Sequence, residues 1–141
     1  MLVDDSSIDN FVSRKTIERS GFAETVLVYE SAATALHYLK ACGKKNNQAC
    51  PVPDIIFLDL NMPVMDGHEF LKEFGKLHRE IREQSKIILL SSSTNLSDMM
   101  LNVKNEYVKA FFSKPLIKKN LEEVESELFG IGREEARLKI A

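Results

Sequence analysis

Acidic, hydroxyl and basic residues end four short apolar runs of this chain. Asp4 and Asp5 follow the first run, Asp59 and Ser91 end the second and third, and Lys114 follows the fourth. The runs are residues 2–3, 54–59, 86–91 and 110–113. Buried parallel strands read as continuous apolar runs, and ligands bind outside the carboxyl ends of such strands. If the runs are neighbouring strands, three carboxylates, a hydroxyl and an ammonium lie at one edge of a sheet.

Such a group of side chains has a definite chemistry. Mg²⁺ takes oxygen ligands, commonly one or two carboxylates together with waters and phosphate oxygens. A carboxylate can attack phosphorus to give an aspartyl phosphate, and a cation and a hydroxyl donor offset the charge on the transferring group. Asp4, Asp5 and Asp59 would repel one another unless a cation lay among them. The pattern therefore predicts a site for a divalent cation and a phosphoryl group.

The composition argues against several other classes of protein. A chain of 141 residues, 44% of them hydrophobic and 28% charged, fits one globular domain. A formal charge of −2 gives no electrostatic reason to bind nucleic acid. No apolar stretch approaches the ~20 residues of a membrane span, and we expect no signal peptide before Leu2. Cys42 and Cys50 lack metal-site spacing, so we expect unpaired thiols in a cytoplasmic protein.

Helical and strand patterns alternate along the chain, which is typical of β/α units around a parallel sheet. A further strand is expected over residues 25–29. Residues 6–9 have the form of a capping box, and Ile8, Phe11 and Val12 begin the apolar face of a first helix. Apolar stripes predict the later helices: Ala32, Ala35, Leu36 and Leu39; Phe70, Phe74, Leu77 and Ile81; Leu96, Met99, Met100 and Val103; Ile117, Leu121, Val124 and Leu128.

Four short motifs together resemble the receiver domain of two-component response regulators. They are Val3-Asp4-Asp5, the run from Asp59 to Gly67, the hydroxyl at Ser91, and Lys114-Pro115. As a whole the chain resembles a stand-alone receiver of the chemotaxis-regulator type. The resemblance implies a flavodoxin-like, doubly wound α/β fold, with five parallel strands in the order 2-1-3-4-5 and helices on both faces. It covers residues 1–130 and leaves 131–141 as a charged tail with no output domain.

The resemblance assigns roles to the acidic residues. Asp59 would be the phosphoacceptor. Asp5 and Asp59 would bind Mg²⁺ directly, together with the backbone carbonyl of Asn61, and Asp4 would act mainly through a bound water. The expected cofactor is therefore Mg²⁺.

It also assigns roles on the later strands. Ser91 would be the switch hydroxyl, with Ser92 or Ser93 in its place if the strand ends later. Lys114 would contact the phosphoryl oxygens, the bond before Pro115 would be cis, and Phe111 would be the switch aromatic.

These roles predict a signalling switch rather than an enzyme. A sensor histidine kinase or a histidine phosphotransfer protein would supply the phosphoryl group. The face formed by helix 4, strand 5 and helix 5 would then signal to an unknown protein target. No nucleic acid and no membrane are expected as partners.

Two alternatives remain open. A degenerate receiver would act as an interaction module without phosphorylation, although the acidic residues and Lys114 are intact. A phosphohydrolase with an aspartyl nucleophile would need a general acid two residues after Asp59. Asn61 stands there and cannot take that role.

Overall fold

A five-stranded parallel sheet forms the centre of the computed structural model, which describes residues 1–43, 50–92 and 104–130. The strand order is β2-β1-β3-β4-β5, as predicted. The strands are β1 (Leu2–Val3), β2 (Val28–Tyr29), β3 (Ile55–Asp59), β4 (Lys86–Ser91) and β5 (Val108–Ser113). Compared with the sequence prediction, β2 is shorter and β5 begins two residues earlier, at Val108 rather than Ala110.

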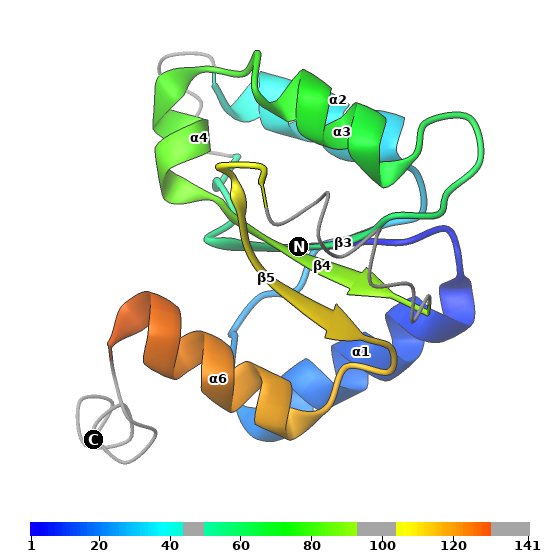
Figure 1. The fold of residues 1–141 in the computed structure, drawn as a ribbon, viewed down its shortest axis with the longest axis vertical. Helices are drawn as coiled ribbons and strands as arrows, with labels where there is room; N and C mark the ends of the chain where they lie inside the picture. The colour runs from blue at the N-terminus through cyan, green and yellow to red at the C-terminus, as the bar shows by residue number, and fades with distance from the viewer. Residues whose placement is uncertain (44–49, 93–103, 131–141) are drawn as a thin grey trace.

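Helices cover both faces of the sheet (Figure 1). They are α1 (Ser7–Ser20), α2 (Ala32–Cys42), α3 (Gly67–Phe74), α4 (Arg79–Gln84) and α6 (Lys118–Phe129). In Figure 1, α1 and α6 lie on one face and α2, α3 and α4 on the other.

The core has two parts because side chains alternate along each strand. On β3, Phe57 packs in the cluster that contains Ile17 of α1 and Leu121 of α6. Its neighbours Ile56 and Leu58 pack in the cluster that contains α2, α3 and α4 residues. All five residues of β3 are buried, which explains why the run is almost wholly apolar.

The predicted single helix over Phe70–Ile81 is wrong. The chain forms α3, which ends at Phe74, and a separate α4 that begins at Arg79. Gly75 follows α3, and glycine is a poor helix former. A Cβ at Gly75 would lie 3.3 Å from the ring of Tyr107, so this aromatic side chain packs against the break. The stripe of apolar residues survives because both helices bury it on the same face of the sheet.

The predicted apolar face of α1 is exposed to solvent. Ile8, Phe11 and Val12 are 74%, 62% and 40% exposed. The buried face instead consists of Asn10, Ser13 and Ile17. Small and polar residues occupy this face because the start of the helix lies close to the backbone after β1, where the Asn10 side chain donates to the Asp4 carbonyl.

The two cysteines form a disulfide, which corrects the expectation of unpaired thiols. Cys42 ends α2 and Cys50 lies eight residues later, with a Cα–Cα distance of 5.1 Å. The chain lies beside α2 at this point, and the hydroxyl of Tyr38 on that helix donates to the carbonyl of Pro51.

Some predictions fall outside the described residues. These are the helix expected around Leu96–Val103, the hydroxyl of Ser93 and the tail over residues 131–141. Within the described part of the chain, no helix is both long and apolar enough to cross a membrane.

Candidate functional site

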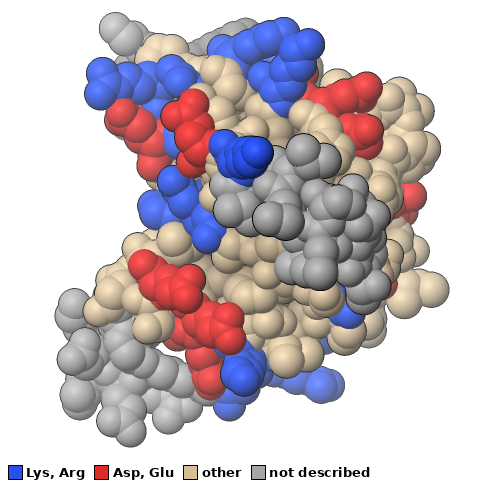
Figure 2. Space-filling model, in the orientation of Figure 1, with Lys and Arg blue, Asp and Glu red and all other residues tan. Residues whose placement is uncertain are grey.

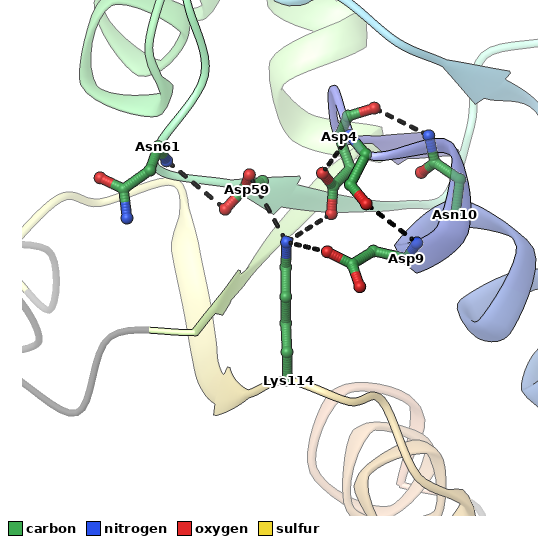
Figure 3. Close-up of polar contacts among 7 residues, drawn as sticks. Asp4, Asp9, Asn10, Asp59, Asn61 and Lys114 are labelled. Carbon is green, nitrogen blue, oxygen red and sulfur yellow. Dashed lines mark hydrogen bonds and ion pairs between the residues drawn. The ribbon is translucent and has the colours of Figure 1, made fainter.

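The ends of β1, β3 and β5 bring the predicted charged residues together. Val3 pairs with Leu58, so Asp4 and Asp59 follow at neighbouring positions of the sheet edge. Both are nearly buried, with 7% and 5% of their surface exposed. Lys114 follows β5 directly, and its side chain extends to these carboxylates (Figure 3). The bond between Lys114 and Pro115 is cis, as predicted.

Lys114 is the cation of this cluster. Its Nζ lies 2.6 Å from Oδ2 of Asp4, 3.0 Å from Oδ2 of Asp9 and 3.5 Å from Oδ2 of Asp59. One ammonium thus contacts three carboxylates from three different parts of the chain. The arrangement is a charge network in which the negative groups outnumber the positive one.

Ser6, the N-cap of α1, and Asn10 within the helix hold Asp4 in place. The Ser6 N–H donates to Oδ1 of Asp4 at 2.9 Å, and the Asn10 side chain donates to the Asp4 carbonyl at 2.7 Å. These bonds leave Oδ2 of Asp4 for Lys114. The start of α1 therefore fixes the orientation of this carboxylate.

The predicted capping box forms only in half. The Ser6 hydroxyl accepts from the Asp9 N–H at 3.2 Å, as expected for an N-cap. The return bond is missing because the Ser6 N–H donates to Asp4 and the Asp9 carboxylate binds Lys114. The local capping pattern is thus partly replaced by contacts at the site.

Asp59 ends β3, and the start of α3 packs closely against its backbone. The Asn61 N–H points to Oδ1 of Asp59 at 3.4 Å. A Cβ on Gly67 would come within 2.8 Å of the Asp59 carbonyl oxygen and of the Leu60 Cα. Only glycine permits α3 to begin so close to the end of β3. This packing positions the Asp59 backbone.

The environment changes the proton affinity of two groups. Burial, and then the negative charge of Asp4, raises the pKa of Asp59 to about 6, although Lys114 and the Asn61 N–H lower it. Burial opposes the charged form of Lys114, but its bonds to Asp4 and Asp9 and the charges of Asp4 and Asp59 outweigh this effect. They raise the pKa of Lys114 to about 12.

Three carboxylates could hold a metal ion. One oxygen from each of Asp4, Asp5 and Asp59 lies within 4.8 Å of the others. Asp5 is exposed, whereas the other two are buried. Hard oxygen ligands of this kind suit Mg²⁺, so the residues present fit the expected ion.

The two residues predicted to act in switching lie on β4 and β5. Ser91 is the last residue of β4 and is fully buried, and its carbonyl accepts from the Lys114 N–H. Phe111 is half-buried on β5 opposite Leu89 and packs against the core. Both positions agree with the predicted roles, which remain predictions.

Sequence reasoning missed three contributors to the site, namely Asp9, Asn10 and Gly67. Asp9 was interpreted only as part of a capping box, although it lies close to Asp5 in the sequence and could have been placed at the same edge. A polar Asn10 on the buried face carried no comparable signal. Gly67 was noted only as the last residue of the motif that begins at Asp59.

The sequence and the fold identify the family. A family model described as "Response regulator receiver domain" matches residues 1–124. The chain belongs to the response regulator receiver family. Receiver domains are the signalling switches of two-component systems, interact with histidine kinases or phosphotransfer proteins, and generally bind Mg²⁺ at an acidic pocket.

Individual receivers show the same relationship. A response regulator receiver protein from Dyadobacter fermentans is 30% identical, with a TM-score of 0.78 over 91% of this chain and 94% of its own. The chemotaxis protein CheY of Bacillus subtilis is 29% identical over 115 residues, which are 82% of this chain and 83% of that protein. A probable methanogenesis regulatory protein, FilR2, from Methanothrix harundinacea is 26% identical over 137 residues, or 94% of this chain and 84% of its own.

Proposed function

We propose that this receiver accepts a phosphoryl group on Asp59 from a phosphohistidine of a partner protein and signals through its β5 and α6 side. The observation that carries the proposal is the meeting of Asp4, Asp5, Asp59 and Lys114 at one sheet edge. A structural salt bridge would need one carboxylate for the lysine. The excess of carboxylates is expected at a site that also takes a cation and a phosphoryl group.

The residues divide the chemistry among them. An oxygen of Asp59 forms the new bond to phosphorus while the bond from phosphorus to the histidine nitrogen breaks. Lys114, whose Nζ lies 3.5 Å from Oδ2 of Asp59, would contact the phosphoryl oxygens, and Ser91 would supply a hydroxyl donor. Mg²⁺, held by Asp5, Asp59 and the Asn61 carbonyl, would neutralise charge on the transferring group. Phe111 would couple this edge to the output side.

The alternative functions receive less support. Asn61 is exposed and its N–H points to Asp59, so the described site offers no general acid at that position for a phosphohydrolase. A phosphorylation-independent module would have no use for a buried carboxylate whose pKa is raised.

Incubation with acetyl phosphate and Mg²⁺ tests the proposal. We expect a labile adduct of one phosphoryl group on Asp59, observed by mass spectrometry of the intact protein and of borohydride-trapped peptides. Asp59→Asn should carry none, and Asp66→Asn, which alters the partly exposed N-cap of α3, should label like the parent chain. Persistent labelling of Asp59→Asn at another side chain would reject the assignment.

Asp5 provides a test of the metal ligands. Its carboxylate is exposed and belongs to the acidic cluster, while the described ion pairs of Lys114 involve Asp4, Asp9 and Asp59. We expect Asp5→Asn to weaken Mg²⁺ binding at least about tenfold while changing apo stability little. An NMR titration with Mg²⁺ measures the affinity. Unchanged affinity would show that Asp5 is not a ligand.

An exposed apolar surface of this chain, close to Asp59, could receive the donor protein. Ile8, Phe11 and Val12 share one exposed side of α1, because residues three and four apart are neighbours on a helix. Asp9, on the same helix, contacts Lys114, so this surface borders the site. We propose that the phosphohistidine protein binds there and brings its imidazole to Asp59.

Phe11→Ser should separate protein-dependent from protein-independent phosphorylation. The ring is 62% exposed, so folding should change little. We expect transfer from a purified cognate phosphohistidine protein to slow at least about tenfold, with unchanged labelling by acetyl phosphate. Phe129→Ser, also on an exposed ring, is the control. Equal loss with both donors would mean that Phe11 supports the site itself.

The proposed donor places the protein in the cytoplasm. There the Cys42–Cys50 bond of the structure would form only under oxidising conditions. Mass spectrometry after rapid alkylation of intact cells would measure the fraction of Cys42 and of Cys50 that is present as the free thiol.

A further inference from the structure

A second charged site lies at the opposite edge of the sheet from Asp59. A cavity of about 450 Å³ opens between α4 and the first residues of β4 and β5. Four cations and two carboxylates line it: Arg79, Arg82, Lys86, Lys109, Glu83 and Glu106. Figure 2 shows Lys and Arg side chains, with Asp and Glu side chains beside them, along an indented side of the molecule. Its charged lining carries a net positive charge.

The cations of this cavity are only partly neutralised. Within the described residues, the ion pair at the cavity joins Arg79 to Glu83 at 2.6 Å. The ammonium of Lys109 donates to the Glu106 backbone carbonyl at 3.0 Å, and the ammonium of Lys86 lies 5.6 Å from the centre of the Phe129 ring. These contacts with neutral groups leave the two lysines able to attract an anion.

Arg82 is held in a fixed position at the cavity. Its Nε donates to the Leu77 carbonyl at 2.8 Å and its Nη1 donates to the Tyr107 hydroxyl at 3.3 Å. Because this hydroxyl accepts from Arg82, its own hydrogen is available to donate to a ligand. The Tyr107 ring is fixed in turn by edge-on contact with Phe74 at 5.2 Å. Such fixed donors lose little entropy on binding.

We propose that this cavity binds a small phosphate monoester. Its volume is that of a small-molecule site rather than of a flat protein interface. Lysine ammonium groups and a fixed arginine are the donors that suit phosphate oxygens. The ligand would contact residues at the start of β4 and β5, whereas the acidic cluster lies beyond their other ends. The proposal therefore does not depend on phosphorylation of Asp59.

An NMR titration of the full chain with adenosine monophosphate tests the proposal. The buffer contains EDTA, so that no metal at the acidic site holds the phosphate, and sodium chloride keeps the ionic strength constant. We expect saturable amide shifts over residues 79–86 and 105–109. Inorganic phosphate should shift the same amides, and adenosine, which lacks the phosphate, should not.

Charge-removing variants decide the location. Lys86→Gln and Lys109→Gln should each weaken binding at least about threefold, and the double variant at least about tenfold. Lys76→Gln, outside the cavity and 63% exposed, should bind like the parent chain. Lys109 is itself exposed, so its variant should fold normally. Equal weakening by Lys76→Gln, shifts centred elsewhere, or binding only of an acidic peptide such as hexaglutamate would overturn the proposal, as would the absence of saturable shifts.

Discussion

Lys114→Met should lower the free energy of unfolding of the metal-free protein by about 2–3 kcal/mol. Removal of the ammonium leaves Asp4, Asp9 and Asp59 without the cation that each contacts within 3.5 Å. Two of these carboxylates are buried, so water cannot replace the lost charge. Urea denaturation in EDTA measures the effect. Saturating Mg²⁺ should recover part of the loss, because it brings positive charge to Asp59.

The same variant should slow labelling by acetyl phosphate at least about 100-fold, which is the usual effect of removing one donor to a developing negative charge. The matched control is Lys76→Met. Its ammonium also lies 2.8 Å from a carboxylate, that of Glu73, but it is 63% exposed. This exposed pair should change stability by less than about 1 kcal/mol. If both variants unfold at the parent urea concentration, Lys114 does not neutralise the cluster.

Asp59→Asn should stabilise the metal-free protein at neutral pH. The folded chain raises the pKa of Asp59 from 3.8 to about 6, first through burial and then through the charge of Asp4. Between these two values the folded state binds more protons at Asp59 than the unfolded state does. The contribution of this group to stability therefore falls as the pH rises through that interval. Asparagine does not titrate, so the Asp59→Asn protein does not lose this contribution to stability as the pH rises.

The difference between the two proteins should be near zero at about pH 4 and reach about 1–2 kcal/mol in favour of Asp59→Asn at pH 7. Urea denaturation at several pH values in EDTA provides the measurement. Glu73→Gln is the control, because the pKa of this exposed carboxyl is lowered by its hydrogen bond to Lys76. If the difference in unfolding free energy were the same from about pH 4 to pH 7, the folded protein would not raise the pKa of Asp59.

The sheet could be predicted because each strand carries its own signal. β3 is buried on both faces and therefore reads as an uninterrupted apolar run. The polar residues at the strand ends then placed Asp4, Asp59 and Lys114 at one edge, where the structure has them. The particular strand order came from the family resemblance rather than from the local pattern.

Helix boundaries and faces were harder to predict. Periodicity records which residues are buried but not whether the backbone between them is continuous, so the stripe across Phe74 and Ile81 hid the break at Gly75. The apolar residues at the start of α1 were predicted to form its buried face, but Ile8 and Phe11 are exposed. Apolar residues on a surface cannot be told from core residues by their type alone.

Two contacts between distant segments were not predicted. The bond from Lys114 to Asp9 joins residues 105 positions apart. Similarly, the disulfide depends on how residues after α2 return to that helix. Spacing in the sequence does not by itself name the partner in either contact.

In the proposed function, the contact between Asp9 and Lys114 would link the chemical state of Asp59 to the surface of α1. A phosphoryl group on Asp59 would add negative charge beside Lys114 and compete for its ammonium. Of the three carboxylates, that of Asp9 is the most exposed, at 43%, so this contact is the least costly to exchange for water. Its loss would loosen the first turn of α1, beside Ile8 and Phe11. A receiver built in this way would bind its phosphohistidine donor more tightly before transfer than after, and so would release the spent donor.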